Sequence, residues 1–237
     1  LLRGCGACGC FQAHSAAWLE HRGARSCSYL LSPIPDPCGP AWLEKRKQAK
    51  KDGKPSILLG PSNVAATSTS AGIRFFAQKV LPLLEKELGP DGFEVRVVGE
   101  GKLPDELARM LPRPSVSVCG RIEPADEEFL SCDIQLVPTP ILLGARKRIL
   151  VGFSFGCCVV SHAKEAINLP EIVDGQNALL ASSGTDMAKA IARAVRSPEL
   201  REELGLGARR TYEACFAPEV AVAPMVRQLQ QMAEGEA

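Results

Sequence analysis

The stretch Ser56-Ile-Leu-Leu-Gly60 decides the fold, because this short apolar run ends in glycine and begins a repeating pattern. A polar loop rich in Ser and Thr follows it. Residues 71–88 then carry apolar side chains at the three- and four-residue spacing of an amphipathic helix. The stretch therefore predicts a strand, a loop and a helix in succession.

The same alternation repeats along the chain, with apolar runs of strand length between helical patterns. Further strands are expected at 93–98, 115–119, 134–137 and 157–160, and helices at 104–111, 126–131, 186–196, 198–212 and 218–232. Short strands that alternate with helices are typical of βαβ units with right-handed crossovers. The predicted fold class is α/β, a doubly wound parallel sheet whose last three helices close the domain.

Composition and charge restrict the kind of protein. The 237 residues carry a formal net charge of +1, which gives no reason to expect a nucleic acid as partner. Hydrophobic residues make up 46% of the chain, enough to bury a core. The sequence has neither a long apolar membrane span nor an apolar signal region, so we expect no transmembrane segment and a cytoplasmic location. Because the chain begins at Leu1 without Met, we expect it to be a fragment.

The first 54 residues differ in amino-acid composition from the rest of the chain. Four prolines between Pro33 and Pro40 exclude a regular helix or an inner strand, which indicates a linker or a domain edge. Six Lys or Arg residues between positions 43 and 54 favour a solvated helix or a hinge.

The ten cysteines fall into two groups. Five lie in apolar segments, where a thiol in a reducing compartment behaves as a small apolar side chain. These are Cys119, Cys132, Cys157, Cys158 and Cys215. Cys5, Cys8 and Cys10, with His14, have part of the spacing of a zinc site. A structural zinc site usually needs two well-spaced ligand pairs, so no metal site is predicted.

Ligands of doubly wound sheets bind at the carboxyl ends of the strands. The candidate rim loops are 60–70, 99–103, 120–124, 138–146 and 161–168. A Gly-x-Gly-x-x-Gly fingerprint is missing, since Gly99-Glu-Gly101-Lys-Leu-Pro104 has Pro in place of the third Gly, and no P-loop motif is present. Both absences disfavour nicotinamide enzymes and P-loop phosphate binding.

Seven short motifs follow one another between residues 55 and 233. They are Val97-Val-Gly-Glu-Gly101, Val116-Ser-Val-Cys-Gly120-Arg-Ile, Asp133-Ile-Gln-Leu-Val-Pro138, Gly144-Ala-Arg-Lys-Arg148-Ile-Leu150, Gly156-Cys-Cys-Val-Val160, Pro170-Glu171 with Asp174-Gly-Gln-Asn177-Ala-Leu-Leu180, and Glu199-Leu-Arg-Glu-Glu-Leu-Gly205. In this order and spacing they resemble the C-terminal, donor-binding domain of GT-B-fold glycosyltransferases, in the broad group 1 (glycogen-synthase-like) family.

The resemblance implies transfer of a sugar from a nucleotide-sugar to an unknown acceptor, with retention of configuration. It implies that residues 55–237 form a Rossmann-like domain that binds the nucleotide-sugar. Residues 1–54 would then be a remnant of the N-terminal acceptor domain and the hinge, and most of that domain would be missing. The nucleotide-sugar is a substrate, so no cofactor is expected.

The family's Gly-x-Arg-x-Lys/Arg segment maps onto Gly144, Arg146 and Arg148. Its cations would stabilise the charge that develops on the diphosphate leaving group. The alternative is a solvated first turn of a helix. Basic residues at that position oppose the helix dipole unless an anion is present, which favours the functional interpretation.

The sequence gives weaker support for a role of the other rim residues in donor binding. Backbone at Gly60, Ser62, Asn63, Gly99 and Gly101 would approach the donor, although ordinary strand-to-helix turns explain the same residues. The resemblance places Arg121 near the base and Glu171, in a Pro-Glu pair, near the donor. A surface arginine is the equal alternative for Arg121. His162 would orient a sugar hydroxyl, or else be a structural hydrogen-bonding group.

Two positions depart from the family. Many members carry two glutamates eight positions apart, the second of which contacts the donor ribose. Leu143 and Val151 occupy those positions here. The alternative function is therefore a non-catalytic GT-B-like interaction or scaffold domain that has lost donor chemistry. An epimerase or phosphorylase on the same architecture is a third possibility.

Overall fold

The computed structural model describes residues 8–24, 27–50 and 52–233. Its centre is a six-stranded sheet in which every pairing is parallel and the strand order is β5-β4-β3-β6-β7-β8. The strands are β3 (Ser56–Asn63), β4 (Glu94–Glu100), β5 (Val116–Gly120), β6 (Ile134–Val137), β7 (Cys158–His162) and β8 (Leu179–Ala181). Strand order reverses between β3 and β6, so the carboxyl ends of these two strands flank the crevice where such sheets bind ligands.

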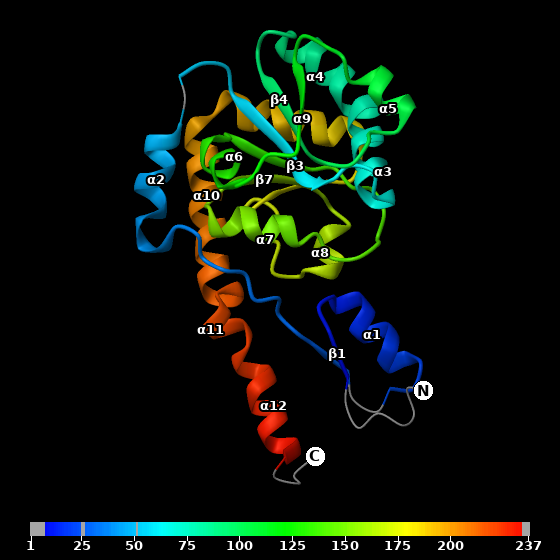
Figure 1. Cartoon of the computed structure of the whole chain (residues 1–237), viewed down its shortest axis with the longest axis vertical. Helices are drawn as coiled ribbons and strands as arrows, with labels where there is room; N and C mark the ends of the chain where they lie inside the picture. Colours follow the sequence, from blue (N-terminus) through cyan, green and yellow to red (C-terminus); the bar gives the residue numbers. More distant parts are fainter. Residues whose placement is uncertain (1–7, 25–26, 51, 234–237) are drawn as a thin grey trace.

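Helices cover both faces of the sheet (Figure 1). In β3, Ile57 and Leu59 pack into one core cluster and Leu58 into the other, because successive strand residues point to opposite faces. The first face carries α3 (Thr67–Phe75), the π-helical turn η3 (Phe76–Val80), α4 (Leu81–Leu88), α5 (Asp105–Met110) and α9 (Gly184–Arg196). The second carries α6 (Asp126–Ser131), α7 (Lys147–Ser154), α10 (Pro198–Thr211) and the π-helical turn η4 (Tyr212–Phe216). The predicted doubly wound α/β class is confirmed.

Several elements differ from the expectation. The helix expected from residue 71 begins at Thr67, and the short strand β8 was not expected. The last helix is divided at Val222 into α11 (Pro218–Ala221) and α12 (Ala223–Ala233). The prediction that it closes the domain is wrong for α12, which extends away from the sheet (Figure 1) and leaves Leu229 58% exposed.

The N-terminal segment contains more regular structure than expected. The strands β1 (Cys8–Cys10) and β2 (Cys27–Tyr29) pair in parallel and are connected by α1 (Ala13–His21). Helix α1 packs against α8 (Glu165–Asn168), which follows β7. The predicted basic helix is present as α2 (Trp42–Ala49), directly after the short 3₁₀ turn η2 (Gly39–Ala41).

The connection between β2 and α2 is fixed to the C-terminal helices. The backbone N–H of Ile34 donates to the carbonyl of Phe216 at 2.9 Å, and the Tyr212 hydroxyl donates to the carbonyl of Ile34 at 2.9 Å. The buried Arg209 forms an ion pair with Asp36. Within the described residues, no helix is long and apolar enough to cross a membrane.

Candidate functional site

The start of α7 brings basic side chains to the carboxyl ends of β6 and β7, beside Thr139 and Glu165. Gly144 has a φ of +74°, a conformation that side chains other than glycine rarely adopt, and Arg146 precedes the first helical residue. Gln135, buried in β6, donates from Nε2 to the carbonyl of Arg148 at 2.7 Å. This hydrogen bond fixes the first turn of α7 against the sheet.

Three charged side chains meet there. Nε of Arg146 lies 3.4 Å from Oε1 of Glu165, which comes from α8. Arg146 also donates from Nη2 to the carbonyl of Leu143 at 2.6 Å, and Arg148 donates from Nη2 to Oγ1 of Thr139 at 3.4 Å. Among the described residues, three buried atoms of this cluster have no hydrogen-bond partner: Nε of Arg146, Nε of Arg148 and Oε2 of Glu165.

Burial determines the electrostatics of the cluster. It raises the pKa of Glu165 to about 7, although Arg146 and Arg148 act in the opposite direction. Burial, together with the neighbouring Arg146, lowers the pKa of Arg148 to about 10, so Arg148 keeps its charge at neutral pH. Two guanidinium groups thus share one carboxylate that is only partly ionised at neutral pH. The cluster carries an excess of positive charge away from bulk water, which favours an anionic ligand.

His162 ends β7 and is buried. Its Nδ1 accepts a hydrogen bond from the backbone N–H of Lys164 at 3.2 Å, which leaves the ring proton on Nε2. Burial and the nearby Lys164 lower the pKa of His162, so the ring is neutral at neutral pH. The side chain therefore has a structural bond at one nitrogen and a donor at the other.

A second group of predicted residues lines a pocket at the carboxyl ends of β3 and β4. Ser62, Asn63, Gly99 and Arg121 line this cavity of ≈ 400 Å³. Oγ of Ser62 is buried without a hydrogen-bond partner. Arg121 is exposed and is paired with Glu100 at 3.6 Å and Glu123 at 2.6 Å.

At two of the predicted rim positions, packing alone explains why the residue is glycine, without any ligand. A Cβ at Gly60 would lie 2.0 Å from the carbonyl oxygen of Val98, and one at Gly99 would lie 1.9 Å from that of Ser62. Both glycines allow β3 and β4 to approach closely at their ends. Gly101 has a φ of +91°, so it serves the turn after β4.

Glu171 lies apart from the arginine cluster. Its Oε2 accepts a hydrogen bond from the Tyr29 hydroxyl at 2.9 Å, and it lines a different pocket, beside Asn177 and Thr211. Of the two positions that depart from the family, Leu143 is 56% exposed and Val151 is partly buried.

Sequence reasoning placed Thr139 and Glu165 in candidate rim loops but gave them no role, and it did not single out Gln135. Thr139 and Gln135 are uncharged and lie at the end of β6 and within it, so only the fold brings them to Arg148. A buried glutamate has no distinct sequence signal when it begins a helix as short as α8.

The N-terminal segment approaches the same edge of the sheet. Nζ of Lys147 lies 5.1 Å from the centre of the Phe11 ring, and Nε2 of Gln12 lies near Gly144. In the part of the chain that the structure describes, no three His, Cys, Asp or Glu side chains are placed to hold a metal ion. Cys8 and Cys10 lie on β1, and Cys5 falls outside the described residues.

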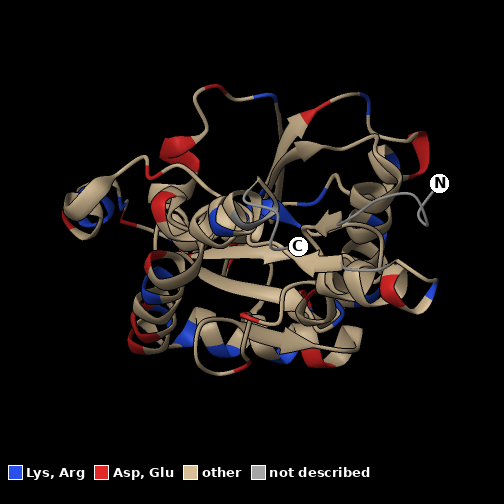
Figure 2. Cartoon of the chain, turned by 90° about the horizontal axis from the view of Figure 1, so that it is seen from below, with Lys and Arg blue, Asp and Glu red and all other residues tan. Residues whose placement is uncertain are grey.

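Charge is otherwise spread over the molecule. Figure 2 shows basic and acidic segments interspersed around the domain.

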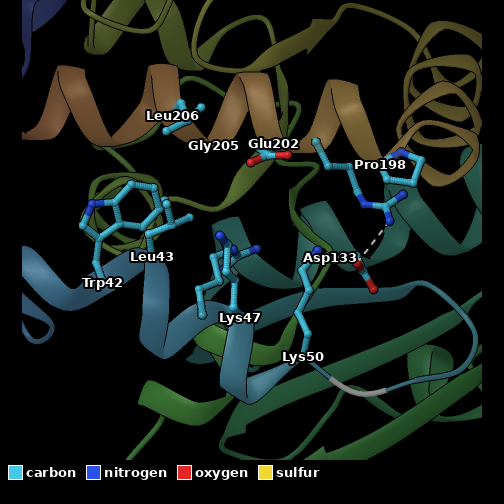
Figure 3. Close-up of a pocket in the computed structure, with 12 residues that line it drawn as sticks. Trp42, Leu43, Lys47, Lys50, Asp133, Pro198, Glu202, Gly205 and Leu206 are labelled. Carbon is cyan, nitrogen blue, oxygen red and sulfur yellow. Dashed lines mark ion pairs between the residues drawn. The ribbon is translucent and has the colours of Figure 1, made fainter.

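A further cavity of ≈ 160 Å³ lies between α2 and α10, at the amino end of the sheet, where Asp133 precedes β6 (Figure 3). Lys50 and Arg201 both pair with Asp133 there, at 3.5 Å and 3.4 Å.

Solved structures with the same fold include several glycosyltransferases. Sucrose-phosphate synthase from Thermosynechococcus elongatus superposes with a TM-score of 0.76 at 16% identity, over 99% of this chain and 60% of that one. HepE of Anabaena in complex with UDP gives 0.74 at 14% identity, over 94% and 63%. The C-terminal domain of the group 1 glycosyltransferase LpcC from Francisella tularensis gives 0.56 at 15% identity, over 78% and 95%.

The chain thus spans about three fifths of the first two of these proteins and nearly all of the third, an isolated C-terminal domain. A comparison with curated protein sequences found no match. The family model "Glycosyl transferases group 1" matches residues 61–197, from the end of β3 to the end of α9. Since that match covers more than half of the chain, the protein belongs to the group 1 glycosyltransferases, and its described fold corresponds to their C-terminal domain.

Proposed function

We propose that this chain is the donor-binding half of a retaining glycosyltransferase and that Arg146 and Arg148 bind the diphosphate of a nucleotide-sugar. The observation that carries the proposal is the buried cluster at the start of α7, where, among the described residues, Nε of Arg148 has no hydrogen-bond partner and Nε of Arg146 faces only Glu165, at 3.4 Å. Buried donors are rarely left unpaired, and a diphosphate supplies the anionic oxygens that would pair them.

The chemistry of the transfer requires cations at this point. Breaking the bond between sugar and phosphate builds negative charge on the leaving diphosphate, and guanidinium groups held in place before the reaction stabilise it. Gln135 and Thr139 would hold the first turn of α7 and the Arg148 side chain. His162 would donate from Nε2 to a sugar hydroxyl.

The nucleotide would occupy the pocket lined by Ser62, Asn63, Gly99 and Arg121. That pocket lies at the carboxyl ends of β3 and β4, on the same edge of the sheet as the arginine cluster. Arg121 would exchange Glu100 or Glu123 for the nucleotide. UDP is the first nucleotide to test, because a protein of the same fold, HepE, has been solved with it.

The acceptor would bind between this domain and an N-terminal domain, to which residues 1–54 would belong in part. We place the protein in the cytoplasm, where a reducing environment suits the free thiols of Cys132, Cys157 and Cys158.

Calorimetric titration with UDP- and GDP-sugars tests the proposal. Binding at or below millimolar donor is expected for at least one of them. An absence of heat at millimolar concentration of every donor would contradict it.

A second candidate is a non-catalytic relative that keeps the fold as an interaction domain. The observation in its favour is that Leu143 and Val151 provide no carboxylate for the donor ribose. Val151→Glu separates the two functions. A weakened transferase should gain donor affinity severalfold, whereas a domain that has lost donor chemistry should show no change.

A further inference from the structure

Two buried cysteines lie side by side at the edge of the sheet opposite the arginine cluster. Cys132 stands two residues before β6, and Cys157 stands directly before the neighbouring strand β7. Their Sγ atoms are 3.9 Å apart, and the residues are 3% and 0% exposed. Because Ile134 of β6 pairs with Cys158 of β7, the residues that precede the two strands lie close together.

A buried arginine from α2 contacts this pair. Arg46 donates from Nη1 to the carbonyl of Phe129 at 2.7 Å and from Nη2 to the carbonyl of Cys132 at 2.6 Å. Nη1 also lies 3.4 Å from Sγ of Cys157. Among the described residues, no carboxylate forms an ion pair with Arg46. A buried guanidinium needs a counter-ion, and the Cys157 sulfur is the group in contact that can become one.

The hydrogen bonds around the pair can accommodate a thiolate at Cys157. Three potential donors converge on the Phe129 carbonyl: Arg46, Cys132 at 3.4 Å and Cys157 at 3.3 Å. A carbonyl oxygen offers two lone pairs, so it cannot satisfy all three. When Cys157 is deprotonated, it accepts from Arg46 and from the Cys132 thiol, and the Phe129 carbonyl keeps the bond from Arg46.

The pKa values follow this arrangement. Burial alone would raise the pKa of Cys157, but the hydrogen bond from Cys132 and the charge of Arg46 outweigh it and lower the value to about 7. Cys158 is the adjacent residue and is equally buried, yet burial raises its pKa to about 12. The chain thus contains an internal control one residue away.

The cavity between α2 and α10 lies next to this pair, although neither Cys132 nor Cys157 lines it. It is lined by Arg46 itself and by Gly156, the residue before Cys157. Lys47 and Lys50 extend from α2 toward α10 along it (Figure 3). Its volume of ≈ 160 Å³ accommodates a molecule the size of a hydroperoxide.

We propose that Cys157 is a peroxide-reactive cysteine and that Cys132 is its resolving partner. The Cys157 thiolate attacks one oxygen of a hydroperoxide, so that an S–O bond forms as the O–O bond breaks. The other oxygen leaves as hydroxide or alkoxide and takes up a proton. Sγ of Cys132 then attacks the sulfenic sulfur. The S–S bond forms, and the sulfenic oxygen leaves as water with the Cys132 proton.

Peptide mapping of the full chain tests this inference. The protein is treated with submillimolar hydrogen peroxide, free thiols are blocked under denaturing conditions, and the digest is examined by mass spectrometry. We expect a disulfide between tryptic peptides 122–146 and 149–164 that fragmentation assigns to Cys132 and Cys157. An unmodified pair under conditions that oxidise the half-buried Cys119 would overturn the proposal.

Three near-isosteric variants sharpen the result. Cys158→Ser should leave the cross-link unchanged. Cys157→Ser should abolish it, and Cys132→Ser should leave a sulfenic acid on Cys157 that dimedone traps. A cross-link that survives Cys157→Ser, or that disappears in Cys158→Ser, would show that Cys157 is not the reactive thiol.

The rate of Cys157 oxidation in Arg46→Met tests the role of the guanidinium. Circular dichroism first checks that this variant is folded. Without the guanidinium, we expect oxidation of Cys157 at pH 7 to slow by roughly 10-fold, since the thiolate fraction falls. An unchanged rate in folded Arg46→Met would contradict the role of Arg46. If Arg46→Met does not fold, the three cysteine variants still decide the identity of the reactive thiol.

Discussion

Nε of Arg146 lies 3.4 Å from Oε1 of Glu165, and the two side chains are only 12% and 2% exposed. This pair supplies a carboxylate to the proposed site, where Leu143 and Val151 occupy the positions at which the resemblance leads us to expect glutamates. The carboxylate comes from α8, which follows β7, and contacts the cation proposed to bind the diphosphate. In the absence of a donor it offsets part of the positive charge of Arg146 and Arg148.

The raised pKa of Glu165 should make stability depend on pH in a defined direction. The folded state keeps the proton to about pH 7, whereas the unfolded chain loses it near 4.5. The contribution of Glu165 to stability is therefore complete below pH 4.5 and is lost as the pH rises through 7. We expect the free energy of unfolding of the wild type, relative to Glu165→Gln, to fall by ~2–3 kcal/mol over this range.

Urea denaturation at several pH values between 4 and 8 measures this difference. Glu202→Gln, at an exposed position on α10, is the control and should change stability by less than about 0.5 kcal/mol. If the free energy of unfolding changes with pH in the same way in the wild type and in Glu165→Gln, then Glu165 titrates as an ordinary carboxyl.

Gly60→Ala should disrupt the junction of β3 with β4. The new methyl would lie 2.0 Å from the carbonyl oxygen of Val98, and φ at this position is +139°. Gly175→Ala is a matched control, since its φ is also positive, at +72°, but no atom lies within 4 Å of the added carbon. We expect Gly60→Ala to cost about 2–3 kcal/mol more than Gly175→Ala in thermal or chemical unfolding. Equal costs would show that the clash is relieved elsewhere.

The sequence predicted most of the sheet and only part of the site. Glycine after an apolar run marked the end of β5 and lay close to the end of β4, where turns and close strand approach require it, but β3 continues past Gly60 to Asn63. The three-residue strand β8 is too short to show a period, and it pairs only with β7. Arg146 and Arg148 could be found from their spacing. Their contacts with Glu165 and Thr139 could not, because only the fold brings the loop after β6 and the start of α8 to these arginines.

The packing of the N-terminal segment could not be predicted either. The spacing of the prolines predicted the irregular connection between β2 and α2. It could not predict that Asp36 in this connection pairs with Arg209 on α10. That pair joins residues separated by 173 positions.

Asp36→Asn should weaken this attachment. Burial alone would raise the pKa of Asp36, but hydrogen bonds from Arg209 and from the backbone N–H groups of Gly39 and Cys38 hold it below its ordinary 3.8. Stability from the ionised carboxylate is therefore present above pH 3.8 and is lost as the pH falls through the lowered value. At pH 7 we expect Asp36→Asn to lower the free energy of unfolding by about 1–3 kcal/mol.

The difference between Asp36→Asn and the wild type should narrow as the pH falls below 3.8. Asp52→Asn, at an exposed position, should follow the wild type throughout. A difference that persists unchanged at low pH would indicate that the amide disturbs packing instead of removing a charge.

The proposed contact between Arg148 and the diphosphate is tested most directly by calorimetric titration of wild type and Arg148→Met with UDP and with uridine. Lys147→Met, which removes a neighbouring exposed cation, is the matched control. We expect Arg148→Met to weaken UDP binding by ~10- to 100-fold, as loss of a charge-assisted hydrogen bond does, and to change uridine binding by less than about 2-fold. Equal losses for UDP and uridine, or UDP binding that Arg148→Met leaves unchanged, would contradict the assignment of Arg148 to the diphosphate.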